Sequence, residues 1–387
     1  MEAQLKNKSF KYLNSEELEN KVGVVVGTRP GIIKMSPIIK DLRNRAIPNF
    51  TINAGQHYSQ NMAGNMFRDL NLPKPEYEIS STKNYSLHGE QTAEMLKGIE
   101  KILIQEKPKV VLVCADANFN LAGALAARKL RLKLGHVEAG LRSYDWRMPE
   151  EHNRVMIDHI SDYLFVPTKL AQNNLVKDNV KGKIIYTGNT IVDSLNENKS
   201  LALEKSTILS DLKLIPKEYF VLTMHREENV DNKRILSNLI LTIEKILDKY
   251  NKPVVYPIHP RSYKMAKKFG VLDKMKNMKS LKLIEPLGYL DFLNLLNNAM
   301  LVLTDSGGIQ EESCILNIPC ITLRENTERP ETVEVGANII AGTNEEAIMN
   351  AITDMLKRNL SWRNPFGDGN AASKIVNSIL NDIKIQN

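Results

Sequence analysis

Carboxylates follow several buried segments in the first half of the sequence, each at the point where an apolar run ends. These residues are Asp116 after Val110–Cys114, Glu138 after Leu134–Val137, and Glu150 with Glu151 after Pro149 at the start of a predicted helix. The carboxyl ends of parallel strands meet at one edge of a sheet, so we expect Asp116 and Glu138 to lie there together. Neighbouring carboxylates have displaced pKa values and can divide acid and base duties. Acids at a helix start are also common for stability alone, which leaves the role of Glu150 and Glu151 open.

Two histidines in the second half occupy matching positions after predicted strands. His225 precedes Arg226 at the end of one strand, and His259 stands two residues before Arg261 at the end of the next. A histidine near an arginine at a strand end suits phosphate binding or proton transfer. A lone histidine is more often structural, but two such pairs in register favour a functional role.

The segment Asp305-Ser306-Gly307-Gly308 follows another predicted strand and opens a helix. Glycines let the backbone approach a phosphate, Ser306 adds a hydroxyl, and the helix N-terminus attracts an anion. Glu312, one turn into that helix, can accept both hydroxyls of a ribose. The segment predicts nucleoside-diphosphate binding, although a glycine-rich turn that only starts a helix remains an alternative.

A second anion-binding candidate lies near the start of the sequence, where Gly27-Thr28-Arg29-Pro30 ends a valine-rich strand and opens a helix. Arg29 and Lys34 place positive charge beside that helix N-terminus. The segment is neither a Walker motif nor GxGxxG, so the usual ATP and NAD signatures are absent. A capping turn with Arg29 in a structural ion pair is the alternative.

The elements that position these residues alternate between buried strands and amphipathic helices, which is typical of right-handed βαβ units in doubly wound sheets. Two such series follow one another, with a hinge near Gly188. We therefore expect an α/β fold with two Rossmann-like domains, preceded by a polar extension over residues 1–20. The facing halves form a cleft, which is the expected active site.

Composition narrows the function classes. The chain has 387 residues, 42% hydrophobic and 25% charged, with a formal charge of +7 spread along its length. The basic residues are not interleaved with aromatics, so we expect no nucleic-acid partner. Three cysteines without a CxxC pair, and no Cys/His cluster, argue against disulfides and metal and favour a cytoplasmic protein. No apolar run approaches ~20 residues, so no membrane span is expected.

The order of the motifs resembles the non-hydrolysing UDP-N-acetylglucosamine 2-epimerase family, and its archaeal-style branch most closely. The motifs are GTRP at Gly27, AGQHY at Ala54, HGEQT at His88, HVEAGLRS at His136, MPEEHNR at Met148, TGNTIVD at Thr187, HREENVDN at His225, IHPR at Ile258, LTDSGGIQEES at Leu303, RENTERPETVEVG at Arg324 and NPFGDGNAA at Asn364. They cover the chain from about Lys21 to its end.

The resemblance implies a glycosyltransferase-B-like fold, with a closing helix at 371–385 that crosses back to the first domain. The domains would then be 21–187 with 371–387, holding the catalytic acids, and 188–370, binding UDP. The implied reaction is reversible C2 epimerisation of UDP-GlcNAc to UDP-ManNAc. UDP leaves by elimination, which gives 2-acetamidoglucal, and returns after protonation on the other face of C2. No cofactor is implied.

The resemblance also assigns roles to single residues, each carried over on a matching motif. The catalytic residues would be Asp116, Glu138, Glu150 and His225. The substrate-binding residues would be Arg29, Lys34, Arg226, His259, Ser306, Gly307, Gly308 and Glu312. Gln56 and His57 lie where a second UDP-GlcNAc acts as allosteric activator, and a homodimer is implied.

Two departures from the family pattern concern the sugar side of the site. Gly31 stands where the family usually has Glu after GTRP. Ala115 and Ala117 flank Asp116 where the family usually reads Gly-Asp-Thr. Ala115 is not expected to adopt the positive φ that glycine allows.

These departures keep other functions open. The alternatives are an epimerase of a modified UDP-HexNAc such as a uronic or diacetamido sugar, a hydrolysing relative, a glycosyltransferase of the same fold, and a weakened sugar-nucleotide sensor. A glycosyltransferase would need an acceptor cleft and would not need three acids beside C2. Binding of UDP without turnover of any UDP-sugar would favour the sensor.

Overall fold

The chain divides into two compact units. The computed structural model describes residues 12–55, 66–79, 87–358 and 361–384. Unit 1 consists of the described parts of Met1–Ser194 and Gly367–Asn387, and unit 2 of those of Leu195–Phe366. The division falls within helix α7 (Thr190–Lys205), which therefore begins in one unit and ends in the other.

Unit 1 is built on a seven-stranded parallel sheet with the order β3-β2-β1-β4-β5-β6-β7. The strands are β1 (Glu19–Val26), β2 (Asn49–Asn53), β3 (Tyr77–Glu78), β4 (Pro108–Cys114), β5 (Lys133–Val137), β6 (Tyr163–Val166) and β7 (Lys183–Tyr186). The helical elements are η1 (Ser15–Glu17), α1 (Arg29–Asn44), α3 (His88–Glu106), α4 (Asn118–Lys129), α5 (Pro149–Ile160), α6 (Lys169–Lys177) and α17 (Ala371–Lys384). The strand order reverses between β1 and β4, and ligands of doubly wound sheets bind outside such a switch point.

The central strands of unit 1 are buried on both faces, which explains their unbroken apolar runs. Val24, Val25 and Val26 of β1 and Val111 and Leu112 of β4 have no exposed surface. Helices follow the strands and cover the sheet, so the polar residues at the strand ends are left at its carboxyl edge. The two valine-rich runs that the sequence predicts as strands are both confirmed.

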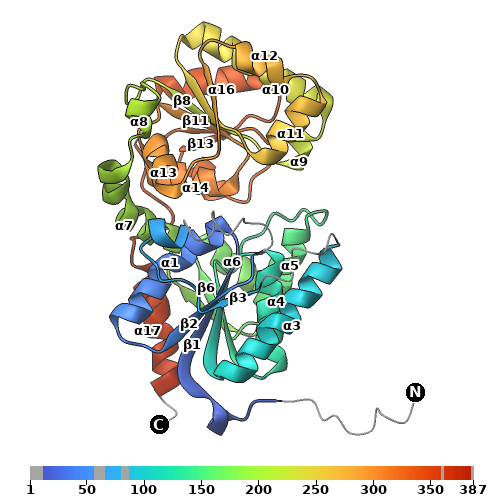
Figure 1. Cartoon of the computed structure of the whole chain (residues 1–387), viewed down its shortest axis with the longest axis vertical. Helices are drawn as coiled ribbons and strands as arrows, with labels where there is room; N and C mark the ends of the chain where they lie inside the picture. Colours follow the sequence, from blue (N-terminus) through green and yellow to red (C-terminus); the bar gives the residue numbers. More distant parts are fainter. Residues whose placement is uncertain (1–11, 56–65, 80–86, 359–360, 385–387) are drawn as a thin grey trace, which may run out of the picture. The chain divides into compact units, whose positions relative to one another are not determined.

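The C-terminal helix α17 packs against α1 within unit 1, and Figure 1 shows the two side by side. Ile375, Val376 and Ile379 of α17 are fully buried. Nη2 of Arg45, which caps the C-terminal end of α1, donates to Oγ of Ser373 at 2.7 Å. The predicted return of the closing helix to the first half of the chain is confirmed.

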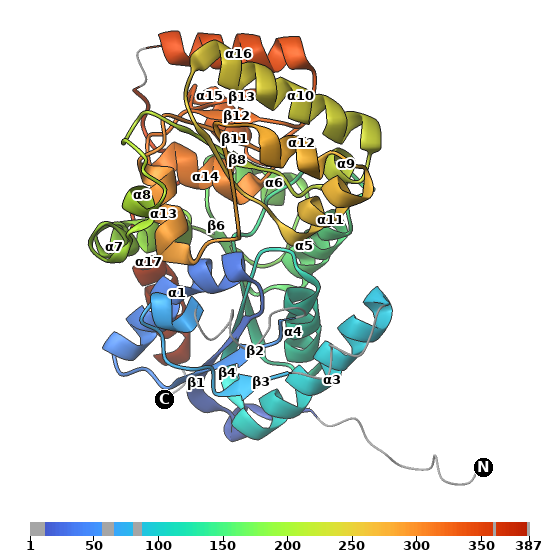
Figure 2. The same cartoon turned by 45° about the horizontal axis from the view of Figure 1, so that its top comes forward.

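Unit 2 is built on a six-stranded parallel sheet with the order β10-β9-β8-β11-β12-β13. The strands are β8 (Phe220–Thr223), β9 (Val254–Pro257), β10 (Leu281–Ile284), β11 (Leu301–Thr304), β12 (Cys320–Thr322) and β13 (Asn338–Ile340). The helices are α8 (Ile208–Asp211), α9 (Glu227–Val230), α10 (Lys233–Tyr250), α11 (Pro260–Lys268), α12 (Leu272–Asn277), α13 (Tyr289–Asn297), α14 (Gly307–Ile315), α15 (Pro330–Glu334) and α16 (Glu345–Lys357). Helices α10 and α16 lie together on one face of this sheet (Figure 2).

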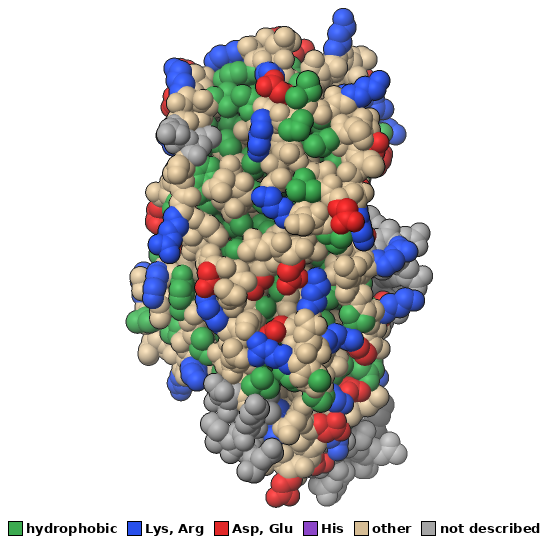
Figure 3. Space-filling view, turned by 90° about the vertical axis from the view of Figure 1, so that its left-hand side faces the viewer, with side chains coloured by type: hydrophobic (Ala, Val, Ile, Leu, Met, Phe, Trp, Pro, Cys, Tyr) green, Lys and Arg blue, Asp and Glu red, His purple; other side chains and the backbone are tan. Residues whose placement is uncertain are grey.

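Basic and acidic side chains are mixed on the face of the molecule drawn in Figure 3. Among the described side chains on that face, Lys and Arg alternate with Asp and Glu and form no continuous patch of one sign.

Among the described helices, none is long and apolar enough to cross a membrane. All three cysteines are buried.

Candidate active site

The first group of candidate residues lies at the carboxyl edge of the unit 1 sheet. Strands β4 and β5 run in parallel with Cys114 opposite Val137, and the amide of Ala115 donates to the Val137 carbonyl at 3.1 Å. Strand β4 ends at Cys114 and strand β5 ends at Val137, so Asp116 lies two residues and Glu138 one residue beyond its strand. This register brings the backbones of Asp116 and Glu138 to one edge of the sheet.

Glu138 is held in a buried ion pair and in an unusual backbone conformation. Its Oε1 lies 2.5 Å from Nζ of Lys34 and 3.1 Å from Nδ2 of Asn189. The side chains of Lys34 and Glu138 are both almost fully buried. The backbone φ of Glu138 is 67°, in the left-handed region that costs a side-chain-bearing residue about 1–2 kcal/mol. Such strain gathers at functional sites, where it aims a side chain that a relaxed backbone would direct elsewhere.

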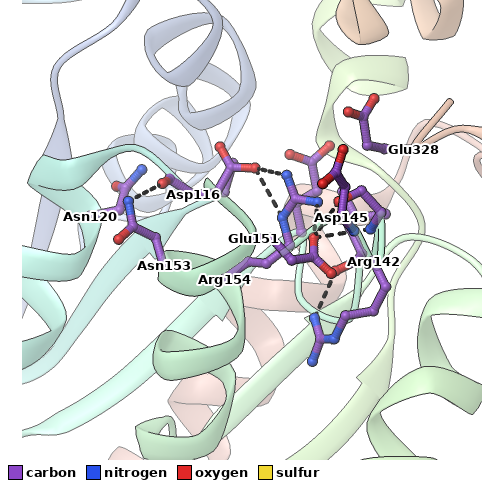
Figure 4. Close-up of polar contacts among 12 residues, drawn as sticks. Asp116, Asn120, Arg142, Asp145, Glu151, Asn153, Arg154 and Glu328 are labelled. Atoms are coloured by element: carbon purple, nitrogen blue, oxygen red, sulfur yellow. Dashed lines mark hydrogen bonds and ion pairs between the residues drawn. The ribbon is translucent and has the colours of Figure 1, made fainter. Parts of the chain in front are cut away.

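Asp116 is held from helix α5 at two points (Figure 4). Nδ2 of Asn153 donates to the Asp116 backbone carbonyl at 2.8 Å, and the guanidinium of Arg154 forms an ion pair with Oδ2 of its carboxylate. The Asp116 side chain keeps 28% of its surface exposed, while Arg154 is buried. Asp116 is therefore an oriented carboxylate that can still reach a ligand.

The two acids that open α5 differ sharply in their surroundings. Glu151 is buried, and its carboxylate accepts hydrogen bonds from Ser143, from the amide of Tyr144 and from Arg154. Glu150 is partly exposed and makes no hydrogen bond or ion pair with any described residue. Glu151 thus holds the loop at Ser143 and Tyr144 and the guanidinium of Arg154 in place, whereas the Glu150 carboxylate takes no part in this network.

The structure corrects the expectation for Ala115, which adopts a φ of 63°. The reason is the hydrogen bonding on both sides of the residue. Its amide is fixed by Val137, and its carbonyl accepts from Nε2 of His136 at 3.1 Å. The other ring nitrogen of His136 lies 2.7 Å from Asp158, and both side chains are fully buried. The fold therefore imposes the left-handed turn even without glycine.

Gly31 lies in the first turn of α1, which Thr28 caps. The Gly31 amide donates to Oγ1 of Thr28 at 3.4 Å. A Cβ at this position would lie 3.3 Å from Oγ1 of Thr28 and 3.6 Å from Cζ of Phe119. The first of these distances is tighter than an ordinary contact, so a larger residue at position 31 would require the Thr28 side chain to shift by a few tenths of an ångström.

The second group of candidate residues lies at the carboxyl edge of the unit 2 sheet, around Asp305. Asp305 is fully buried, and its Oδ1 lies 3.1 Å from Nδ1 of His225. Its Oδ2 accepts from the amides of His225 and Arg226 and from Nδ2 of Asn229. Burial alone would raise the pKa of Asp305, but the hydrogen bonds and charge of His225 and the backbone amides lower it below the ordinary value. An ionised Asp305 holds the His225 ring through Nδ1. Nε2 is the ring nitrogen that Asp305 does not hold.

His259 stands beside this pair, with its ring centroid 5.6 Å from that of His225. It caps helix α11, because its Nδ1 accepts from the Arg261 amide at 3.2 Å. Burial, followed by the charge of His225, lowers the pKa of His259 below its ordinary value. Because Nδ1 accepts the Arg261 amide, Nε2 is the ring nitrogen that can donate a hydrogen bond to a ligand.

The Ser306-Gly307-Gly308 turn forms the N-terminus of α14 next to Asp305. A Cβ on Gly307 would come no closer than 3.4 Å to Oε2 of Glu328, and one on Gly308 no closer than 3.9 Å to Oγ of Ser306. Neither glycine has a positive φ. The protein's own packing and backbone therefore leave space for a side chain at both positions. Glu312 follows within α14 and is mostly buried.

Arginines and carboxylates pair behind this turn. Nη1 and Nη2 of Arg324 contact the two carboxylate oxygens of Glu328 at 2.9 and 3.0 Å, and both side chains are buried. Burial alone would raise the pKa of Glu328, but Arg324, with the charges of Arg226 and Arg329, outweighs it and lowers the pKa to about 2. Nε of Arg226 is buried and has no hydrogen-bond partner among the described residues.

The remaining candidates are placed as follows. Arg29 is the first residue of α1 and is partly buried. Gln56 and His57 lie outside the described residues. Within the described part of the chain, no three His, Cys, Asp or Glu side chains gather as a metal ion would need.

Several contributors were missed by the sequence reasoning although their motifs were recognised. Asp305, Arg154 and Asn189 stand inside LTDSGGIQEES, MPEEHNR and TGNTIVD, and each contacts a candidate residue. The signal available in the sequence for Arg154 was its place one helical turn after Glu151. No local pattern indicated that Asn189 reaches Glu138, 51 residues earlier in the chain.

Two Rossmann-like units, with polar residues gathered at the carboxyl ends of their parallel strands, define the glycosyltransferase-B-like class of α/β proteins. A family model described as UDP-N-acetylglucosamine 2-epimerase matches residues 40–380. The chain belongs to this family.

Relatives support the same assignment over nearly the whole chain. A UDP-N-acetylglucosamine 2-epimerase of Methanococcus maripaludis is 52% identical over 367 residues, which cover 94% of this chain and 99% of that one. The crystal structure of the Methanocaldococcus jannaschii UDP-GlcNAc 2-epimerase in complex with UDP-GlcNAc and UDP matches with a TM-score of 0.88 and 50% identity, covering 93% of this chain and 99% of that one. A UDP-2,3-diacetamido-2,3-dideoxy-D-glucuronate 2-epimerase of Pseudomonas aeruginosa is 36% identical and covers 92% of this chain and 98% of its own length.

Proposed function

We propose that this protein interconverts UDP-GlcNAc and UDP-ManNAc by reversible epimerisation at C2. The observation that carries the proposal is the pair of oriented carboxylates at one sheet edge, Glu138 bound to Lys34 and Asp116 bound to Arg154, in a chain half identical to UDP-GlcNAc 2-epimerases. Inversion at a carbon that bears hydrogen needs one group to remove the proton and another to return it on the opposite face.

The proposed chemistry balances without a redox cofactor. One carboxylate takes the C2 proton while the C1–O bond breaks, so that the C–H electron pair forms the C1=C2 double bond of 2-acetamidoglucal and UDP departs. A second acid then protonates C2 from the other face, and UDP adds back to C1. Asp116, Glu138 and Glu150 are the proposed acids and bases, and Lys34 compensates the buried charge of Glu138.

Unit 2 is proposed to bind UDP. The Ser306-Gly307-Gly308 turn offers backbone amides at a helix N-terminus, and Arg226 has a buried guanidinium nitrogen without a partner among the described residues. His225 and His259 are proposed to contact the diphosphate, where a hydrogen bond to the departing oxygen stabilises the charge that develops in elimination. Glu312 is proposed to accept the ribose hydroxyls, and Arg29 to contact phosphate or sugar.

Further parts of the proposal concern assembly and control. We propose a cytoplasmic homodimer, with a second UDP-GlcNAc as activator near Gln56 and His57. Sedimentation analysis with and without UDP-GlcNAc tests the dimer. A rate that rises more than linearly with UDP-GlcNAc concentration tests the activator.

The test of the reaction is a proton NMR time course of UDP-GlcNAc with the purified protein in D2O. Formation of UDP-ManNAc with deuterium at C2 is the expected result. If UDP-GlcNAc is unchanged while UDP binds, the proposal fails for this sugar. Turnover of a diacetamido or uronic UDP-sugar would then assign the modified-substrate reaction, and turnover of none would assign a binding protein.

A further inference from the structure

Helix α5 controls which oxygen of Asp116 is available for proton transfer. Nε of Arg154 donates to Oδ2 of Asp116 at 3.1 Å, and Nη2 of the same guanidinium contacts the same oxygen. Oδ1 has no hydrogen bond to any other described residue, on a side chain that is 28% exposed. The two carboxylate oxygens are therefore chemically unlike.

The guanidinium can orient a base without competing for its proton. Arginine stays protonated in proteins, so it donates to Oδ2 and takes nothing from it. Two charge-assisted hydrogen bonds on Oδ2 reduce the basicity of that oxygen and leave Oδ1 as the favoured acceptor. We propose that Arg154 is the positioning residue that directs proton transfer to Oδ1 of Asp116, an inference that rests on the proposed epimerase function.

Glu151 fixes Arg154 from the opposite side (Figure 4). Its Oε2 accepts from Nη1 of Arg154 at 2.7 Å, three residues away on α5. The same carboxylate holds the amides of Ser143 and Tyr144 at 3.0 Å each. Glu151 is anchored to the loop that contains Ser143 and Tyr144. The Arg154 guanidinium therefore cannot turn away from Asp116 without losing its buried ion pair with Glu151.

The backbone of Asp116 is fixed independently of its side chain. Nδ2 of Asn153 donates both to the Asp116 carbonyl at 2.8 Å and to Oδ1 of Asn118 at 2.9 Å. Loss of Arg154 should therefore leave the Asp116 backbone in place, while it releases the Asp116 carboxylate and breaks the ion pair with Glu151. A lysine at this position keeps the charge but lacks the planar fork that contacts Asp116 and Glu151 together.

A double-mutant cycle separates positioning from general structural damage. We would measure kcat and KM for UDP-GlcNAc in R154K, R154Q, D116N and the two double variants, with R43Q as a matched control. Arg43 forms a half-exposed ion pair with Glu76 at 2.7 Å in the last turn of α1, and such pairs contribute little.

The expected result is a loss of about 10²-fold in kcat for R154Q, with KM changed less than about threefold, because a small misplacement of a reacting group costs that much. R154K should lose about 10-fold, and R43Q should match the wild type. In the D116N background, R154K and R154Q should cause no further loss, because Arg154 acts only through that carboxylate.

Either of two results would overturn this inference and leave the proposed function standing. The first is turnover of both Arg154 variants within twofold of the wild type. The second is that each Arg154 substitution lowers kcat by the same factor whether residue 116 is Asp or Asn. If R154Q does not fold, as judged by its melting curve, the R154K cycle decides in the same way. Absence of C2 exchange in the wild-type protein would overturn the proposed function and this inference with it.

Discussion

Oδ1 of the fully buried Asp305 lies 3.1 Å from Nδ1 of His225, and the same carboxylate accepts the backbone amides of His225 and Arg226. One aspartate thus orients both the ring of His225 and the turn that carries it. The ring stays 38% exposed, so its far nitrogen can meet a ligand.

We predict that Asp305→Asn lowers kcat by at least about 10²-fold, because an amide no longer selects the tautomer with the proton on Nδ1. UDP affinity should change less than kcat. Turnover measurements, calorimetric titration with UDP and NMR of the His225 ring nitrogens check the prediction. Asp248→Asn, an exposed site on α10, is the control and should be silent.

Glu138→Gln should abolish turnover while leaving UDP binding largely intact. The amide cannot take a proton, and it leaves the charge of the buried Lys34 without its carboxylate. Conversion of UDP-GlcNAc followed by NMR, with UDP binding measured in parallel, checks this. Normal turnover would remove Glu138 from the mechanism.

Substitution of Glu150 should lower activity, whereas substitution of its neighbour Glu151 should lower stability. Glu150→Gln should lower turnover with little change in the melting temperature, because the Glu150 carboxylate makes no hydrogen bond or ion pair with any described residue. Glu151→Gln should lower the unfolding free energy by about 3–5 kcal/mol, because it breaks a buried ion pair with Arg154. The opposite pattern, in which Glu150→Gln destabilises the fold and Glu151→Gln does not, would contradict the assignment.

Ala115→Gly should stabilise the protein. At a φ of 63°, alanine carries a left-handed cost of about 1–2 kcal/mol that glycine avoids, offset by about 0.5–1 kcal/mol of glycine chain entropy. A gain of roughly 0.5–1 kcal/mol in unfolding free energy is expected from denaturant titration. Ala93→Gly, on the exposed face of α3, is the matched control and should lose about 1 kcal/mol instead.

We predict that the ionised carboxylate of Glu328 stabilises the fold at neutral pH and that this contribution is lost in acid. Its pKa is lowered from 4.5 to about 2 in the folded protein, so the unfolded chain binds its proton more readily. The contribution is complete above pH 4.5, falls away as the pH drops toward 2, and is on the order of 3 kcal/mol. Unfolding free energies of the wild type and Glu328→Gln, measured between pH 6 and 3, should converge as the pH falls. Curves that stay parallel would contradict the prediction.

Much of the fold follows from patterns within single segments. The apolar runs at Val22–Val26 and Val110–Cys114 predict buried strands, and both lie within strands of the unit 1 sheet, β1 and β4. Short elements such as α12, α15 and β13 give too little periodicity to be predicted from the sequence.

The site was less predictable for a physical reason. The sequence places Asp116 and Glu138 at strand ends, but Arg154 reaches Asp116 across 38 residues and Asn189 reaches Glu138 across 51. Such contacts depend on how helices settle on the sheet. The left-handed backbone at Ala115 is equally non-local, since Val137 and His136 impose it from the neighbouring strand.

Helix α17 lies on α1, although all of unit 2 separates them along the chain. During translation, unit 2 emerges from the ribosome as one continuous stretch and can fold at once. Unit 1 must wait, because Ala371–Lys384 is synthesised after everything else it needs. Until then the surface of α1 that α17 covers stays exposed on the nascent chain, and exposed apolar surface of this kind is prone to aggregation.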